Sequence, residues 1–255
     1  KYQIKIINSP KLTSKFFLSF INGFHILFLM LKCIFLLKKK GINILISTGG
    51  YMSLPLCFAA YILNIKIYLF EPNMVLGRAN SFFLKLSNKI FCYSKEIKKY
   101  PKKHINKIVL IDPLLRKFFY TPLEIDKKSI EQSVNILIIG GSQSAELFDT
   151  SLNKAIVDIS KKYRLKIFHQ TKSKNFKNLE YFYKKNNIEN KVFTFDDDIS
   201  DYFSKTNLCI TRAGASTLSE LTYLNIPYIA IPFRLAKDNH QFYNALFYKN
   251  KNKGY

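Results

Sequence analysis

The sequence of 255 residues lacks internal repeats and long tracts of glycine, serine or proline. These absences argue against solenoid repeats and flexible tethers. The hydrophobic fraction, 48%, is too high for a disordered chain. A chain of this length can hold two domains of ordinary size, each burying its own core.

Cysteine is also scarce. The four cysteines are Cys33, Cys57, Cys92 and Cys209. They show no paired spacing of the kind that binds a metal, and each lies in or beside an apolar run, where a buried free thiol is expected. The dinucleotide fingerprint GxGxxG is absent as well. We therefore expect a reducing compartment, we do not infer NAD, and no pattern in the sequence points to a bound metal or another cofactor.

Acidic residues are few: 17 Asp and Glu stand against 40 Lys and Arg, which gives a net charge of +23. Such a balance suggests a polyanionic partner, namely nucleic acid, an anionic membrane or phosphorylated substrates. Only five of the basic residues are arginine, the better reader of phosphates and guanines. An AT-rich genome explains a lysine-rich chain as well as a partner does. No recognition helix, aromatic RNA-binding motif or zinc spacing supports nucleic-acid binding.

A long run without any charge, residues 16–31, is followed by Lys32. A helix that spans a bilayer needs about 20 predominantly apolar residues, so this segment is a poor candidate. It predicts a helix from about residue 25 to residue 40 that is apolar on more than one side. One side would pack on a sheet and another can contact lipid headgroups, with residues 38–40, all lysine, at the surface.

Short β-branched runs alternate with segments of helical periodicity. The runs that predict strands are residues 3–7, 43–47, 66–70, 89–93, 107–111, 134–139, 164–169, 191–194, 207–211 and 227–231. Helical segments include residues 54–63, 77–87, 151–161 and 217–224. This alternation implies parallel sheets with helices on both faces.

The alternation breaks over residues 112–133, which contain two prolines and a charged stretch. We interpret this segment as a connection between an N-terminal domain, residues 1–111, and a C-terminal domain, residues 134–255. The expected fold class is α/β, with two Rossmann-like domains that have parallel sheets and a cleft between them. Ligands of such sheets bind beyond the carboxyl ends of the strands.

The loop Gly140-Gly141-Ser142-Gln143-Ser144 follows the strand at residues 134–139. Its two glycines allow a sharp turn and a close approach of the backbone, and the following amides can bind an anionic or sugar oxygen. A plain turn between strand and helix is the alternative.

A second loop runs from Thr211 to Glu220 and opens a helix. Ser216 or Thr217 can cap that helix, and its first amides, together with the helix dipole, suit a pyrophosphate. Glu220 lies one turn further on, where a carboxylate can accept hydrogen bonds from both hydroxyls of a ribose. Alternatively, Glu220 only completes the capping arrangement.

Other polar loops also follow strands. The run Asn-His-Gln-Phe-Tyr-Asn at residues 239–244 can hydrogen-bond a sugar, and its His240 is either a base or, as is commoner, a solvated residue. In the first domain, residues 47–51 and residues 71–80 are either plain turns or the lining of a cleft.

Taken together and in this order, these loops resemble the MurG family over nearly all of the chain. The segments that carry the resemblance are GGSQS, RAGASTLSE, IPF…DNHQFYNA, TGGYMSLP and EPNMVLGRAN. The resemblance implies a two-domain glycosyltransferase fold, termed GT-B, and inverting transfer of N-acetylglucosamine from UDP-N-acetylglucosamine to lipid I, which gives lipid II. It also implies a peripheral position on the cytoplasmic face of the bacterial plasma membrane and an anionic membrane surface as a partner.

The resemblance further implies which residues bind the donor. They are Asn73, Arg116, Ser142, Gln143, Asp196, Ala215, Ser216, Thr217, Glu220 and Gln241. Ala215, Ser216 and Thr217 would surround the phosphates, Glu220 the ribose and Gln241 the sugar hydroxyls, while the backbone at Asp196 would meet the uracil. Arg116 matches the family pattern least well.

The sequence departs from the family at Pro72, Ala213 and Ser144, and it starts after the glycine-rich loop in which the family carries a catalytic His. The resemblance therefore implies donor binding without normal turnover, and it leaves the base unassigned. Three alternatives stay open: a glycolipid synthase, a UDP-sugar epimerase of the same architecture, and a basic nucleic-acid-binding protein.

Overall fold

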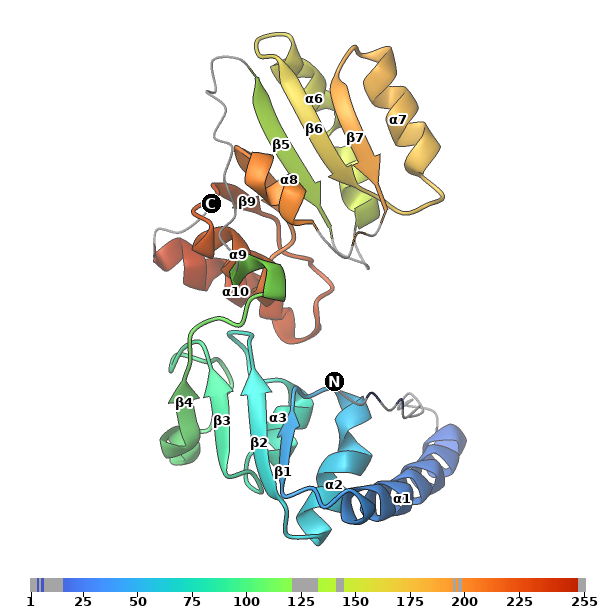
Figure 1. Cartoon of the computed structure of the whole chain (residues 1–255), viewed down its shortest axis with the longest axis vertical. Coiled ribbons are helices and arrows are strands. Elements are labelled where there is room, and N and C mark those ends of the chain that lie inside the picture. Colours follow the sequence, from blue (N-terminus) through green and yellow to red (C-terminus); the bar gives the residue numbers. More distant parts are fainter. Residues whose placement is uncertain are drawn as a thin grey trace. The chain divides into compact units, whose positions relative to one another are not determined.

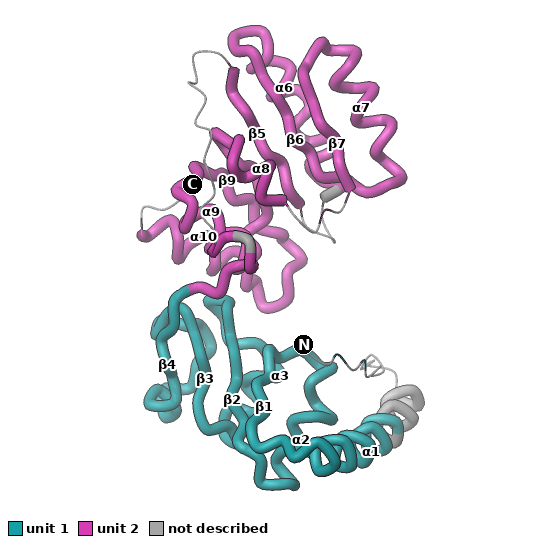
Figure 2. Tube along the Cα trace, in the orientation of Figure 1, with its two compact units in different colours: residues 1–112 teal, residues 113–255 magenta. Residues whose placement is uncertain are grey.

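The computed structural model describes residues 4, 6, 16–120, 133–140, 145–194, 196 and 199–251 (Figure 1). The chain divides into two compact units, Lys1–Asp112 and Pro113–Tyr255 (Figure 2). Each unit is built on one parallel sheet, as the alternation of strands and helices predicts.

The first unit has a four-stranded sheet in the order β1-β2-β3-β4. Its strands are β1 (Ile44–Ser47), β2 (Lys66–Glu71), β3 (Lys89–Cys92) and β4 (Ile108–Leu110). Its helices are α1 (Phe16–Lys39), η1 (Tyr51–Ser53), α2 (Leu54–Ile62), α3 (Arg78–Phe83) and η2 (Lys102–Lys107). The carboxyl ends of β1 and β2 lead into the TGGY and EPN loops, so both loops lie at the same edge of the sheet.

Helix α1 is longer than expected, because it begins at Phe16 rather than near residue 25. Leu29, Cys33 and Leu37 are buried, and Cys33 and Leu37 join the core that also contains residues of β1 and β2. The helix contacts α2 along this face, so its partner includes a helix and is not the sheet alone. Within the described part of the chain, no helix is long and apolar enough to cross a membrane.

The second unit has a five-stranded sheet in the order β7-β6-β5-β8-β9. Its strands are β5 (Val134–Ile139), β6 (Leu165–Gln170), β7 (Glu189–Phe193), β8 (Leu208–Thr211) and β9 (Tyr228–Ala230). Its helices are η3 (Lys117–Tyr120), η4 (Ala145–Leu147), α5 (Phe148–Ser151), α6 (Asn153–Ser160), α7 (Phe176–Lys185), α8 (Ser200–Lys205), α9 (Ala215–Tyr223), η5 (Lys237–Asn239) and α10 (His240–Asn250).

Strand β5 is apolar on both faces because the sheet is covered on both sides. Leu137 and Ile139 join the core formed with α8, α9 and α10, whereas Ile136 and Ile138 join the core formed with α5, α6 and α7. β5 is also the strand at which the order reverses, since β6 lies on one side of it and β8 on the other. Sheets of this topology bind ligands at that point, beyond the carboxyl ends of the strands.

Helices α1, α2, α7 and α9 share one type of C-terminal turn, which ends each helix. Gly41, Asn64, Asn187 and Asn225 have positive φ angles of 59°, 56°, 54° and 52°, two residues after α1, α2, α7 and α9. The amide of the next residue, an isoleucine in each case, then binds back to a helix carbonyl: Ile42 to Leu37, Ile65 to Ala60, Ile188 to Tyr183 and Ile226 to Leu221. This is the Schellman motif, with asparagine in place of glycine at three of the four sites.

Every predicted strand from residue 43 onward has a counterpart in the two sheets. The strand predicted at residues 3–7 falls mostly outside the described residues, and Ile4 and Ile6 are not in a strand. The connection predicted at residues 112–133 is in part a folded element of the second unit, because Phe119 of η3 is buried in its core. Residues 121–132 lie outside the description.

Candidate functional site

In the second unit, β5 ends at Ile139 and is followed by Gly140, which is buried and outside the strand. The following loop, which contains Ser142 and Gln143, lies outside the described residues. Their assignment to the donor therefore stays a prediction. The same holds for Asp196, which is partly exposed and stands between residues that are not described.

Helix α9 begins beside the end of β5, because β5 and β8 are paired and α9 follows β8. Its N-cap residue is Gly214, with an extended backbone (φ −72°, ψ 135°) and no side-chain hydrogen bond to the helix start. The prediction that Ser216 or Thr217 caps the helix is wrong, because Ala215 is already the first helical residue. The N-cap, Gly214, lies two residues before Ser216 and three before Thr217, and the Gly214 amide donates to the Arg212 carbonyl.

Because no side chain caps α9, the first amides of this helix are available to bind a ligand. The first amides of a helix have no partner within the helix, and here no side chain of the cap residue supplies one. These amides and the positive end of the helix dipole together favour an anion. A Cβ atom added to Gly214 would meet Thr217 Oγ1 at 3.9 Å and no closer atom. The assignment of Ala215, Ser216 and Thr217 to the phosphates stays a prediction; of the three, Ser216 is exposed and Ala215 is buried.

Glu220, on the next turn of α9, is 1% exposed and faces a cation. Arg116 donates from Nε to Oε1 at 2.7 Å and from Nη2 to Oε2 at 2.6 Å. The guanidinium also lies over the ring of Phe119, 5.5 Å from its centroid. Two residues that the sequence assigned separately to the donor are thus brought together, and Glu220 does not act as part of a cap.

Arg212, between β8 and α9, was not among the predicted site residues. It is 7% exposed, and its guanidinium lies 5.0 Å from the ring of Phe148 and 5.5 Å from that of Phe233. Nη1 donates to the carbonyls of Ile231 and Pro232 at 3.2 and 3.3 Å, whereas Nε is buried without a hydrogen-bond partner. Burial lowers the pKa of Arg212.

No carboxylate forms an ion pair with Arg212 in the part of the chain that the structure describes. A buried cation next to an uncapped helix start is therefore available to balance an anion. One signal in the sequence pointed to it: an arginine directly between a strand and a helix, in a chain with few arginines.

The segment before α10 turns through Asp238 and Asn239, which both have positive φ. The Oε1 atom of Gln241 accepts a hydrogen bond from the backbone amide of Phe233 at 2.9 Å. This bond holds the end of the β9 segment against α10 and leaves the side-chain NH₂ of Gln241 as a donor group. The ring of His240 lies 2.9 Å from the Lys237 carbonyl through Nδ1, a local contact within its own turn.

In the first unit, the TGGY and EPN…GRAN motifs form one network around a buried acid. Glu71 is 3% exposed and accepts hydrogen bonds from the amide of Gly77 (2.7 Å) and from the side chains of Asn73 (3.1 Å) and Asn80 (3.0 Å). Gly49 of the TGGY motif lies beside Asn80 of this network, because a Cβ atom added to Gly49 would lie 3.0 Å from Asn80 Oδ1. Asn73, predicted to bind the donor, has its amide directed to Glu71.

The cysteines match their prediction as free, buried thiols. Burial, with a contribution from the charge of Glu71, raises the pKa of Cys92 to about 12. Burial raises the pKa of Cys33 and Cys57 as well. Thiols in this state are inert. Among the described residues, no three His, Cys, Asp or Glu side chains are grouped to hold a metal ion.

Comparisons with known proteins agree with this geometry. Residues 135–255 match the glycosyltransferase family 28 C-terminal domain, and residues 1–92 match the N-terminal domain of the same family. Two parallel α/β units with these matches define the class as a glycosyltransferase of GT-B architecture. The chain belongs to glycosyltransferase family 28 and, within it, to the MurG family.

Individual relatives support the assignment. A protein of Pelagibacter ubique named UDP-N-acetylglucosamine–N-acetylmuramyl-(pentapeptide) pyrophosphoryl-undecaprenol N-acetylglucosamine transferase is 51% identical over 248 residues, which are 97% of this chain and 69% of the relative. A Rickettsia canadensis protein of the same name is 35% identical over 229 residues, 89% of this chain and 65% of the relative. The crystal structure of Acinetobacter baumannii MurG matches with a TM-score of 0.72 and 25% identity, over 99% of this chain and 68% of that one. The chain thus spans about two thirds of the length of these relatives.

Proposed function

We propose that this chain takes part in the transfer of N-acetylglucosamine from UDP-N-acetylglucosamine to lipid I, which forms lipid II in peptidoglycan synthesis. The observation that carries the proposal is the 51% identity, over nearly the whole chain, to a transferase named for this reaction. The start of α9, with its uncapped amides and the buried Arg212, supports it because UDP is a diphosphate.

Three parts of the donor, the diphosphate, the ribose and the sugar, have a group of matching chemistry in the second unit. The amides at Ala215, Ser216 and Thr217 and the Arg212 guanidinium suit the diphosphate. The Glu220 carboxylate, fixed by Arg116, suits the two ribose hydroxyls, since each of its oxygens can accept more than one hydrogen bond. The NH₂ group of Gln241 suits a sugar hydroxyl.

This arrangement favours the departure of UDP. As the bond between the sugar and the diphosphate breaks, negative charge grows on the leaving phosphate. Helix amides and a fixed cation lower the energy of that charge without reorganising, because they are already directed to the site. Removal of the proton from the acceptor hydroxyl requires a base, to which no described residue is assigned.

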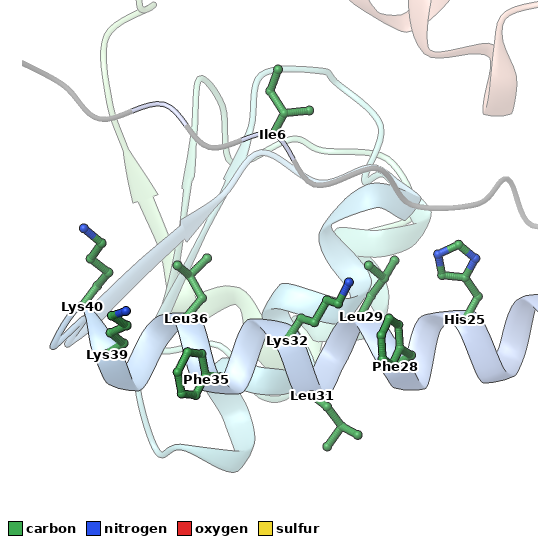
Figure 3. Close-up of a pocket in the computed structure, with 10 residues that line it drawn as sticks. All are labelled: Ile6, His25, Phe28, Leu29, Leu31, Lys32, Phe35, Leu36, Lys39 and Lys40. Atoms are coloured by element: carbon green, nitrogen blue, oxygen red, sulfur yellow. The ribbon is translucent and has the colours of Figure 1, made fainter.

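The exposed face of α1 fits an anionic membrane surface, where the lipid-linked acceptor would lie. Phe28, Leu31 and Phe35 are 54%, 56% and 69% exposed and recur at helical spacing along α1 (Figure 3). Lys32 lies over the ring of Phe28 and Lys39 over the ring of Phe35. Aromatic side chains among lysines bind the interface of a bilayer by insertion and by charge. We place the protein at the cytoplasmic face of the plasma membrane, as a peripheral protein.

Calorimetric titration of UDP-N-acetylglucosamine into the purified chain tests the donor assignment. We expect saturable binding that UDP inhibits by competition, and titration without detectable heat or competition would contradict it. Incubation of the chain with donor and either lipid I or diacylglycerol, followed by product analysis, tests the acceptor. Glucosaminylated diacylglycerol, or an epimerised UDP-sugar, would favour the two enzymatic alternatives.

A further inference from the structure

A buried histidine in the second unit has no place in the donor site described above. His169, on β6, is 0% exposed and lies between α5 and α7 in the core on one face of the sheet. Its Nδ1 atom is 2.7 Å from the hydroxyl of Tyr183, and its Nε2 atom is 3.5 Å from Oδ1 of Asp149. These three side chains come from β6, α7 and α5, so the contact is tertiary.

Elementary hydrogen-bond chemistry fixes the proton on this ring. Burial lowers the pKa of His169, although the charge of Asp149 opposes that effect, so the imidazole is neutral near pH 7. A neutral imidazole carries one N–H and one lone pair. A lone pair on Nε2 would face the Asp149 carboxylate and be repelled by it. The stable form therefore has the proton on Nε2, directed to Asp149, while the hydroxyl of Tyr183 donates to Nδ1.

Asp149 in turn joins two segments that leave the sheet at neighbouring strands. Its Oδ2 atom accepts hydrogen bonds from Thr171 Oγ1 and from Asn175 Nδ2, both at 2.7 Å. The 3.5 Å contact between His169 Nε2 and Asp149 Oδ1 is an electrostatic contact, longer than a good hydrogen bond. Burial disfavours ionisation of Asp149, but the nearby His169 ring and the hydrogen bonds from Asn175 and Thr171 lower its pKa on balance. The ionised carboxylate thus ties α5, which follows β5, to the segment between β6 and α7.

The residue before Asp149 connects this network to the donor site. Phe148 is 0% exposed, and the guanidinium of Arg212 lies 5.0 Å from the centroid of its ring. The Phe148 ring supports this guanidinium together with the Phe233 ring and the carbonyls of Ile231 and Pro232. Any shift of α5 therefore moves the surface on which Arg212 rests, next to the first turn of α9.

We propose that His169 and Asp149 are positioning residues for the donor diphosphate, which act through Phe148 and Arg212. The Nε2–H group of His169 orients the carboxylate, the carboxylate fixes α5, and α5 holds the ring that supports the Arg212 guanidinium. The role rests on the proposed donor site. His169 and Asp149 would support that site without contacting the sugar or the nucleotide themselves.

Two substitutions of the same residue separate this role from mere packing. The amide of His169→Gln can place an N–H group near the position of Nε2, whereas that of His169→Asn reaches only the position of Nδ1. We expect His169→Asn to weaken UDP binding by about tenfold and His169→Gln by no more than about threefold. The affinities for UDP are measured at a temperature at which circular dichroism and thermal unfolding show both variants to be folded. Equal affinities of the two variants for UDP would overturn the proposal.

Asp149→Asn is the second variant and serves if His169→Asn does not fold. It retains the size of the side chain and can still accept from Thr171 and Asn175, but it replaces the charge that faces Nε2–H. We expect UDP affinity to fall by about tenfold here too. Binding of UDP as tight as in the unmodified chain would contradict the proposal.

Nuclear magnetic resonance of the unmodified chain tests the proton directly. The chain has four histidines, so long-range ¹H–¹⁵N spectra can be assigned by single substitutions. We expect His169 to show the Nε2–H form at neutral pH, and an Nδ1–H or doubly protonated ring would overturn the proposal. If the unmodified chain binds no UDP, the proposed function fails, and the positioning role is then decided by this spectrum and by hydrogen exchange. Exchange at the Phe148 and Asp149 amides should become faster in His169→Asn but not in His169→Gln.

Discussion

Arg116 and Glu220 lie 104 residues apart in the sequence and form a two-pronged ion pair, with N–O distances of 2.7 and 2.6 Å. The Glu220 side chain is 2% exposed, whereas that of Arg116 is 41% exposed. A buried carboxylate is stable only when its charge is compensated. Arg116, the residue directly before η3, supplies the compensating positive charge. The pair therefore fastens the segment before η3 to α9 and fixes the acid that we assign to the ribose.

Glu220→Gln should weaken the binding of UDP by about tenfold or more, because an amide loses one acceptor oxygen and the charge. Calorimetric titration measures the effect. Glu189→Gln is the matched control, since Glu189 pairs with Lys166 at an exposed position in the same unit. If Glu220→Gln lost stability and UDP affinity in equal measure, the residue would be structural.

Arg116→Ala should lower the free energy of unfolding by about 1–3 kcal/mol, because it leaves the Glu220 carboxylate buried without its cation. Chemical denaturation followed by circular dichroism measures the change. Lys205→Ala removes an exposed pair with Asp201 and should cost no more than about 0.5 kcal/mol. Similar losses in the two variants would show that the buried pair contributes no more than a surface pair.

Gly49→Ala should destabilise the first unit more than Gly50→Ala does. Both glycines have positive φ, 80° and 79°, so an alanine is strained at either position. At Gly49 the new Cβ would also press on the Asn80 side chain, whereas at Gly50 it meets nothing within 4 Å. Denaturation of the two variants gives the comparison, and equal midpoints would exclude a role for the Asn80 contact.

Acidification should destabilise the second unit. The folded pKa of His169 lies below its ordinary value of about 6.5, so the unfolded chain binds more protons as the pH falls below that value. The lowered pKa of Asp149 acts in the same direction at lower pH. Unfolding free energies measured from pH 7 to pH 5 should therefore decrease.

The decrease over that range should be smaller in His169→Gln, which has no titrating ring at this site. His240→Gln is the control, because His240 lies in the same unit and its ring contacts the Lys237 carbonyl of its own turn, outside the buried network. An unchanged pH dependence in His169→Gln would contradict the assignment.

Phe35→Ser should weaken binding to vesicles of anionic lipid by about fivefold, because a largely exposed ring no longer inserts into the interface. Phe82→Ser changes another exposed phenylalanine of the first unit, 58% exposed and on α3, and should leave the affinity unchanged. Co-sedimentation with anionic and with neutral vesicles measures both variants. Equal binding of the two variants would exclude the face of α1 as the membrane surface.

The sequence was sufficient to predict the layered architecture because its signals are local. Continuous apolar runs such as residues 136–139 specify strands buried on both faces, and segments of helical period between such strands favour parallel pairing. Asn64, Asn187 and Asn225 mark helix ends for an equally local reason, since asparagine tolerates positive φ. The start of α9 was misplaced because Ser216 and Thr217 are good caps by residue type, whereas the turn at Gly214 decided the boundary.

What the sequence determined by itself is therefore the order of strands and helices, the break between two units, and the loops at which a donor should bind. Only the tertiary structure decided which of those residues meet. The pairing of Arg116 with Glu220, the contact of Gly49 with Asn80 and the alignment of Tyr183, His169 and Asp149 all join separate elements. Such contacts depend on strand order and on the burial of charge, which the spacing of residues along the chain does not encode.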